Sequence, residues 1–168
     1  MCRHCRAATG ALTRPFAGAR YTVGVDAQVQ IRTAGEADAE ALAALSGELG
    51  YPSTPEQVLS RLCLLRDPER TILVAQAGGV VAGFIDVHVQ RVVESEPYAE
   101  IGGLVVGAAN RRKGVGAALL EAAADWARER ELRRVVIRAG SERRGAHDFY
   151  PAVGCRVLKH QHVYEYPL

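Results

Sequence analysis

The stretch that most constrains the fold runs from Tyr98 to Arg130 and reads YAEIGGLVVGAANRRKGVGAALLEAAADWARER. It begins with β-branched and apolar residues typical of a strand, passes through the basic, glycine-containing segment 110–116, and continues in alanines and leucines typical of a helix. A turn before a helix leaves backbone N–H groups without intrahelical acceptors, and glycines let an anion approach them. The stretch therefore predicts a phosphate-binding turn, although glycines at such a turn also serve tightness alone.

A glycine pair interrupts the predicted strand. Gly102 and Gly103 lie among Ile, Leu and Val. Glycine inside a strand favours a bulge or a close backbone approach, or else it accommodates a large neighbour. Strict alternation along the strand predicts that Glu100 shares a face with Leu104. Glu100 then either faces a site or lies at a strand edge in water.

Composition limits the functions that this chain can have. The 168 residues suffice for one domain with its own core, and 48% are hydrophobic and 24% charged. No apolar run reaches the roughly 18 residues that a membrane helix needs. A net charge of +2 gives no ground for nucleic-acid binding. Cysteines at positions 2, 5, 63 and 155 are too scattered for a disulfide scaffold or a metal site, so we expect a reducing, cytoplasmic location and no metal.

The order of the predicted elements indicates an α+β fold in which a mixed, mostly antiparallel sheet is flanked by helices. Residues 1–28 lack periodicity and are predicted to be a poorly structured extension whose removal leaves folding unaltered; residues 29–168 are predicted to form one domain. His88 is expected on the polar face of the sheet or, less simply, at a substrate. Strands are predicted at 29–32, 71–77, 80–90, 98–106, 135–137 and 157–166. Helices are predicted after the first strand as far as Gly50, and at 54–65, 115–130 and 143–153.

Capping and turn residues mark three of these boundaries. The first helix can be capped either by Thr33 with Glu36 or by Gly35 with Asp38. Thr54 and Gln57 predict a capping box at the second helix, and Gly78-Gly79 predicts a hairpin between two strands.

Three segments together resemble the Gcn5-related N-acetyltransferases, called GNAT below. The run Arg111–Ala117, which follows the strand end Leu104–Val106, resembles the signature Arg/Gln-x-x-Gly-x-Gly/Ala of that family. Ala99-Glu100-Ile101 opens the same strand, and the segment Ala146–Gly154 is similar to the Ala-x-x-Phe-Tyr-x-x-x-Gly element. The resemblance extends over residues 29–168 and implies the GNAT fold with a central strand, turn and helix that bind acetyl-CoA.

The resemblance also implies which residues bind the coenzyme. The turn would hold the pyrophosphate mainly through backbone N–H groups, and the strand end would pair with the pantetheine arm, with the Leu104 N–H as oxyanion donor. The expected cofactor-binding residues are Leu104, Val105, Val106, Arg111, Arg112, Lys113, Gly114, Val115, Gly116, Ala117 and Tyr150.

Two further side chains take catalytic roles if the resemblance holds. Glu100 matches the general base of Gcn5-like members, and Tyr150 matches the tyrosine that protonates the departing thiolate. The chain departs from the family pattern at Arg143, where Asn is common, and at Cys155, where Phe is usual. These departures put coenzyme contacts near the last helix in doubt.

The predicted function is transfer of an acetyl group from acetyl-CoA to a primary amine of a small molecule, by direct attack on the thioester. The alternative is a catalytically weak GNAT module that binds acyl-CoA as a sensor or assembly partner; retention of Glu100 and Tyr150 favours the enzyme. The expected partner is the amine, with no nucleic acid or membrane, and a homodimer is left open. A nucleotide-binding turn of another fold is disfavoured because Gly-Lys-Ser/Thr is absent.

Overall fold

The computed structural model describes the backbone of residues 19–23 and 27–168 and the side chains from residue 29 onward. The chain divides into two compact units, one ending at Arg138 and the other comprising Ala139–Leu168. In the described ranges no helix is long and apolar enough to cross a membrane.

The first unit contains a six-stranded sheet in which strands that follow one another in the chain are also neighbours in space. The first five strands run antiparallel, and the sixth is parallel to the fifth. The predicted α+β class with a mixed, mostly antiparallel sheet is therefore confirmed. The strands are β1 (Ala19–Val23), β2 (Ala27–Thr33), β3 (Arg70–Ala77), β4 (Val80–Val92), β5 (Ser95–Val106) and β6 (Val135–Ile137).

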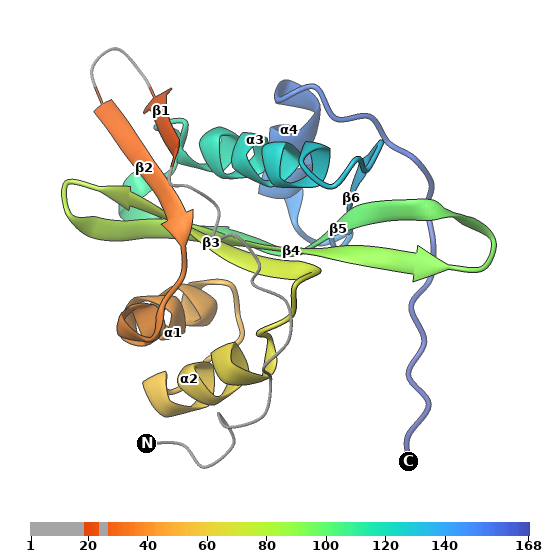
Figure 1. Cartoon of the computed structure of the whole chain (residues 1–168), viewed down its shortest axis with the longest axis horizontal. Coiled ribbons are helices and arrows are strands. Elements are labelled where there is room, and N and C mark those ends of the chain that lie inside the picture. The colour runs from red at the N-terminus through yellow and green to blue at the C-terminus, as the bar shows by residue number, and fades with distance from the viewer. Residues whose placement is uncertain (1–18, 24–26) are drawn as a thin grey trace. The chain divides into compact units, whose positions relative to one another are not determined.

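Helices of the first unit lie on both faces of this sheet (Figure 1). Helices α1 (Ala39–Glu48) and α2 (Pro55–Leu64) cover one face, where Leu42 and Val58 pack on Val74 of β3. Helix α3 (Val115–Arg128) covers the other face and buries Leu119 against the sheet. Short 3-10 turns, η1 (Glu36–Asp38) and η2 (Ala108–Asn110), precede α1 and α3.

Two local predictions about the chain's turns and caps are confirmed. Gly78 and Gly79 have φ angles of 58° and 84° and join β3 to β4, as expected for a hairpin turn that needs positive φ at both positions. Helix α2 begins with a capping box, in which Gln57 N–H donates to Thr54 Oγ1 and Thr54 N–H donates to Gln57 Oε1.

The predicted extent of the N-terminal extension was wrong in part. Within residues 1–28, Ala19–Val23 forms β1, which pairs antiparallel with β2. Weak periodicity hid this strand, because backbone pairing with β2 does not need a regular apolar pattern. Residues 1–18 and 24–26 of the predicted extension lie outside the described part of the chain.

The second unit confirms one predicted element and contradicts another. Helix α4 (Arg144–Ala152) is close to the predicted helix at 143–153. The strand predicted at 157–166 is wrong: residues 155–168 carry no regular structure, and their side chains are mostly exposed. An alternating apolar pattern produces a strand only where a neighbour supplies the ladder of hydrogen bonds.

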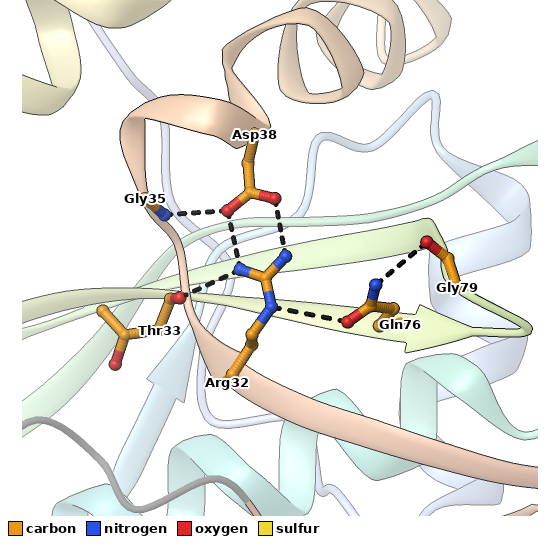
Figure 2. A network of polar contacts seen from close by, with 6 residues as sticks. All are labelled: Arg32, Thr33, Gly35, Asp38, Gln76 and Gly79. Carbon is orange, nitrogen blue, oxygen red and sulfur yellow. Dashed lines mark hydrogen bonds and ion pairs between the residues drawn. The ribbon is translucent and has the colours of Figure 1, made fainter.

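A polar network ties the end of β2 to the start of α1 (Figure 2). Arg32 donates from both Nη atoms to the two carboxylate oxygens of Asp38, each at 2.7 Å, and Asp38 Oδ2 also accepts the Gly35 N–H at 2.8 Å. The Asp38 side chain is only 6% exposed. Hydrogen bonding from Arg32 holds the pKa of Asp38 below its ordinary value. Of the two helix starts that the sequence allowed here, Gly35 with Asp38 is the one observed.

We predict that Asp38→Asn lowers the free energy of unfolding at pH 7 by about 1–3 kcal/mol, because the charge-assisted hydrogen bonds are weakened. Because the carboxyl pKa is lower in the folded than in the unfolded state, ionised Asp38 stabilises the folded protein at pH values above the unfolded pKa of about 3.9. This stabilisation is lost as the pH falls through the folded-state pKa. Urea denaturation at pH 7 and at pH 3 should therefore show a difference between variant and wild type that shrinks at pH 3.

The matched control is Glu36→Gln in the same 3-10 turn. Glu36 pairs with Arg66, and both side chains are more than half exposed. An exposed pair contributes about 0–1 kcal/mol. Equal losses in the two variants would show that the Arg32 network does not anchor α1.

Candidate active site

The glycine pair of β5 forms a bulge, which is one of the alternatives that the sequence left open. Val87 of β4 pairs with Ile101, and the preceding residue Asp86 pairs with Gly103, so Gly102 is one residue more than β4 can match. The insertion interrupts the ladder and bends the strand. The bulge decides where every later residue of β5 points.

The expectation that Glu100 and Leu104 share a face was wrong. Glu100 lies opposite His88, which is on the same face of β4 as Phe84 and therefore on the side of α1 and α2. Leu104 lies opposite Ile85 and packs in the core cluster beneath α3. One extra residue shifts the alternation by one, so side chains beyond the bulge exchange faces. His88 is on the polar face with Glu100, as one of its two interpretations expected.

The bulge also turns two backbone N–H groups away from β4. Gly107 N–H donates to Ala82 O beyond the end of the β4–β5 ladder. In an antiparallel pair successive residues point their N–H groups to alternate sides. Counting back from Gly107, the N–H groups of Val106 and Leu104 point to the opposite edge of β5.

Beyond Ile101, no strand of the described part of the first unit lies beside that opposite edge. Strand β6 pairs with Ala99, Glu100 and Ile101 and ends there. Beyond Ile101, the edge of β5 that carries the Leu104 and Val106 N–H groups is therefore free of ladder bonds to β6. It is suited to an extended ligand with amide groups, as a pantetheine arm has.

Arg138, which the sequence reasoning missed, holds Glu100. Its Nε and Nη2 donate to the two carboxylate oxygens of Glu100 at 2.9 and 3.1 Å, and the Glu100 side chain is 15% exposed. This hydrogen bonding raises the pKa of Arg138. The available signal was the position of Arg138 directly after the short strand β6, two residues beyond Val136, which pairs with Glu100.

A second ion pair supports the bulge from the same face. Arg70 Nε donates to Asp86 Oδ1 at 2.9 Å, and Arg70 Nη2 donates to Asp86 Oδ2. A Cβ on Gly102 would lie 2.7 Å from Asp86 Oδ2. Glycine is therefore needed at position 102 because the carboxylate occupies the space of a side chain.

Arg111, the first cation of the turn, is hydrogen-bonded to other groups of the protein. Arg111 Nε donates to Val106 O at 3.0 Å, and its Nη2 donates to Glu48 Oε2 at 3.2 Å. Glu48, at the end of α1, also accepts the Ala108 N–H at 2.8 Å. Arg112 and Lys113 make no hydrogen bond or ion pair among the described residues, so they are the side chains available to an anion.

The start of α3 fits a diphosphate. Arg112 and Gly114 have positive φ angles of 61° and 83°, which turn the chain sharply before Val115. The N-terminus has no side-chain cap and no acidic residue in its first turn. Ala118 N–H donates to Gly114 O, so the N–H groups of the three residues before Ala118 have no helical acceptor and remain for an anion.

A family model described as the acetyltransferase (GNAT) family matches residues 38–154. The chain belongs to the GNAT family. The resemblance in the sequence is thus confirmed, and the protein is an acetyltransferase with acetyl-CoA as its cosubstrate. None of the curated proteins is significantly similar to it in sequence.

Solved structures share this GNAT fold at low sequence identity. Aminoglycoside N-acetyltransferase AAC(6')-Iy in complex with CoA has a TM-score of 0.76 and 20% identity, covering 88% of this chain and 100% of that chain. A transcriptional regulator from Bacillus halodurans C-125 has a TM-score of 0.74 and 22% identity, covering 82% and 99%. Aminoglycoside 6'-N-acetyltransferase AAC(6')-IG from Acinetobacter haemolyticus has a TM-score of 0.71 and 19% identity, covering 82% and 98%.

Tyr150 lies in the second unit of this GNAT protein, on α4. Its ring makes an edge contact with Phe149, with ring centroids 5.2 Å apart. Burial raises the pKa of the Tyr150 phenol above its ordinary value, and the phenol is protonated at neutral pH with or without this shift. A protonated phenol is what a general acid requires. Its role beside the thioester stays a prediction.

We predict that Gly102→Ala lowers the free energy of unfolding by about 1–3 kcal/mol, because the new methyl group overlaps the Asp86 carboxylate. The distortion of the bulge should also lower kcat/KM. The matched control is Gly103→Ala, where a Cβ would have no neighbour within 4 Å. Urea denaturation and steady-state kinetics of both variants test this, and equal effects at the two positions would contradict it.

Proposed function

We propose that this GNAT enzyme transfers the acetyl group of acetyl-CoA to a primary amine of a small molecule, by direct attack on the thioester. The amine nitrogen bonds to the carbonyl carbon, the carbon–sulfur bond breaks, the amine gives up a proton and the thiolate takes one. The products are an N-substituted acetamide and coenzyme A. The observation that supports this most is the free β5 edge, which leads directly into an uncapped helix start.

In this proposal, backbone groups make most of the contacts that bind acetyl-CoA. N–H groups of Val115, Gly116 and Ala117 hold the diphosphate, with Gly114 shaping the turn and Arg112 and Lys113 adding positive potential. The strand end Leu104–Val106 pairs with the pantetheine arm. The Leu104 N–H, on the free edge, donates to the oxyanion and supplies about 3 kcal/mol of transition-state stabilisation.

Glu100 is the proposed base, directly or through a water molecule. Its ion pair with Arg138 fixes the orientation of the carboxylate, and each oxygen retains a lone pair for a further donor. Tyr150 is the proposed acid for the leaving thiolate and a contact of the coenzyme.

The proposed acceptor class is supported by the names of structures that share this fold. Several structures with this fold are named as aminoglycoside acetyltransferases, and one was solved with a CoA–acetylneamine bisubstrate analogue. Those names support a small-molecule amine. The cytoplasmic location and the homodimer stay predictions.

We predict that Gly116→Asp weakens acetyl-CoA binding about tenfold more than Gly116→Asn, since the two side chains are similar in size and only Asp opposes a diphosphate by charge. Isothermal titration calorimetry on both folded variants gives the two dissociation constants. Equal constants would refute the assignment of the turn.

We predict that Glu100→Gln lowers turnover by about 10²- to 10⁴-fold near neutral pH and that this loss shrinks as pH rises, because more of the amine is then already neutral. Tyr150→Phe should slow turnover with little change in acetyl-CoA affinity, and higher pH should not restore it. Glu96→Gln, at an exposed carboxylate of the same strand, is the control and should behave as wild type. A wild-type rate for Glu100→Gln across pH 6 to 9 would remove Glu100 from the mechanism.

A further inference from the structure

We propose that the acceptor is a primary amine on an apolar body with no second positive charge, and that its apolar body binds in the pocket between α1, α2 and the sheet. This inference rests on the proposed function, because it assumes that an amine attacks the thioester beside the β5 bulge.

The pocket is apolar over most of its lining. Side chains of both helices and of the sheet form its walls, among them Leu42, Leu62, Leu65 and Phe84. Its charged lining residues are Arg61 and Asp86. An apolar body gains free energy by leaving water for such a surface, whereas an ammonium group placed there loses its hydration.

One residue joins this pocket to the reaction site. Asp86 lines the pocket, and its Oδ2 occupies the space that a Cβ on Gly102 would need. The pocket therefore reaches the bulge, on the face of the sheet that carries Glu100. An acceptor whose body fills the pocket has its amine end directed toward the bulge and the Leu104 N–H.

The two acids nearest the bulge, Asp86 and Glu100, are each already paired with an arginine. Asp86 accepts from Arg70 through both oxygens, and Glu100 accepts from Arg138 through both oxygens. Arg61 adds a further positive charge at the pocket. A second ammonium group on the acceptor would meet acids already neutralised and would be desolvated without a partner.

This preference differs from that of the solved structures named as aminoglycoside acetyltransferases, whose acceptors carry several amines. Shared fold at about one-fifth sequence identity leaves the pocket side chains free to differ. The side chains of this chain, and not the fold, therefore set the acceptor class.

The first test compares acceptors with the full-length protein and acetyl-CoA, measuring thiol release at pH 8. The probes are 2-phenylethylamine, spermidine and kanamycin. We expect kcat/KM for 2-phenylethylamine to exceed that for either polycation by about tenfold or more, which is within the range that single pocket contacts produce. Preference for spermidine or kanamycin overturns the inference, as does no turnover of 2-phenylethylamine by protein that binds acetyl-CoA. Failure to bind acetyl-CoA in calorimetry would instead overturn the proposed function.

The second test changes the charge of the pocket. Leu65→Glu places a carboxylate in the lining, and the ratio of kcat/KM for spermidine over 2-phenylethylamine should rise about fivefold or more. Leu64→Glu adds the same group one residue earlier, at a side chain that is 75% exposed and outside the lining, and should leave the ratio unchanged.

A second variant tests the pocket in case Leu65→Glu does not fold. Arg61 is an exposed residue of α2 that lines the pocket, so Arg61→Glu should fold and should move the ratio in the same direction. An unchanged ratio in the folded pocket variants, or an equal rise in Leu64→Glu, would show that the pocket does not bind the acceptor.

Discussion

The single inserted residue at Gly102 is the constraint on which the rest of the site depends. It places Glu100 on the face of α1 and α2 while Leu104 packs under α3, and it turns the Leu104 and Val106 N–H groups away from β4. With a regular strand, those N–H groups would be used within the sheet. The bulge thus converts part of a core strand into a binding surface without removing it from the core.

Three arginines hold the residues around the bulge in place. Arg70 fixes the carboxylate that fills the space beside Gly102, Arg138 fixes the carboxylate of Glu100, and Arg111 ties the end of β5 to α1 through Glu48. Each guanidinium holds a partner in a planar, two-bond arrangement or bridges two groups, which a lysine could not reproduce. These three arginines therefore orient acids and main chain, whereas Arg112 and Lys113 of the turn before α3 make no hydrogen bond or ion pair with the described residues.

The parts of the structure that the sequence predicted well are those decided by near neighbours. The Gly78-Gly79 hairpin, the Thr54 capping box and the turn before α3 each depend on residues within about four positions. The bulge was one of the alternatives foreseen from its glycines, but the exchange of faces was not foreseen, because it depends on which residue of β4 meets Gly103. Arg138 contacts Glu100 only because the chain passes through α3 and returns as β6, parallel to β5. The predicted strand at 157–166 is not formed, because no described strand pairs with these residues. Such contacts are set by tertiary pairing rather than by local pattern.

Strand β1 has a practical consequence. It covers the outer edge of β2, from Ala27 to Ile31, with backbone hydrogen bonds. A shortened chain that begins at Val29 would keep every residue of the site and yet expose a row of unpaired N–H and C=O groups, which invites edge-to-edge association between copies. The residue at which an expressed chain starts therefore decides whether a dimer seen by light scattering reports on the enzyme or on a bare strand.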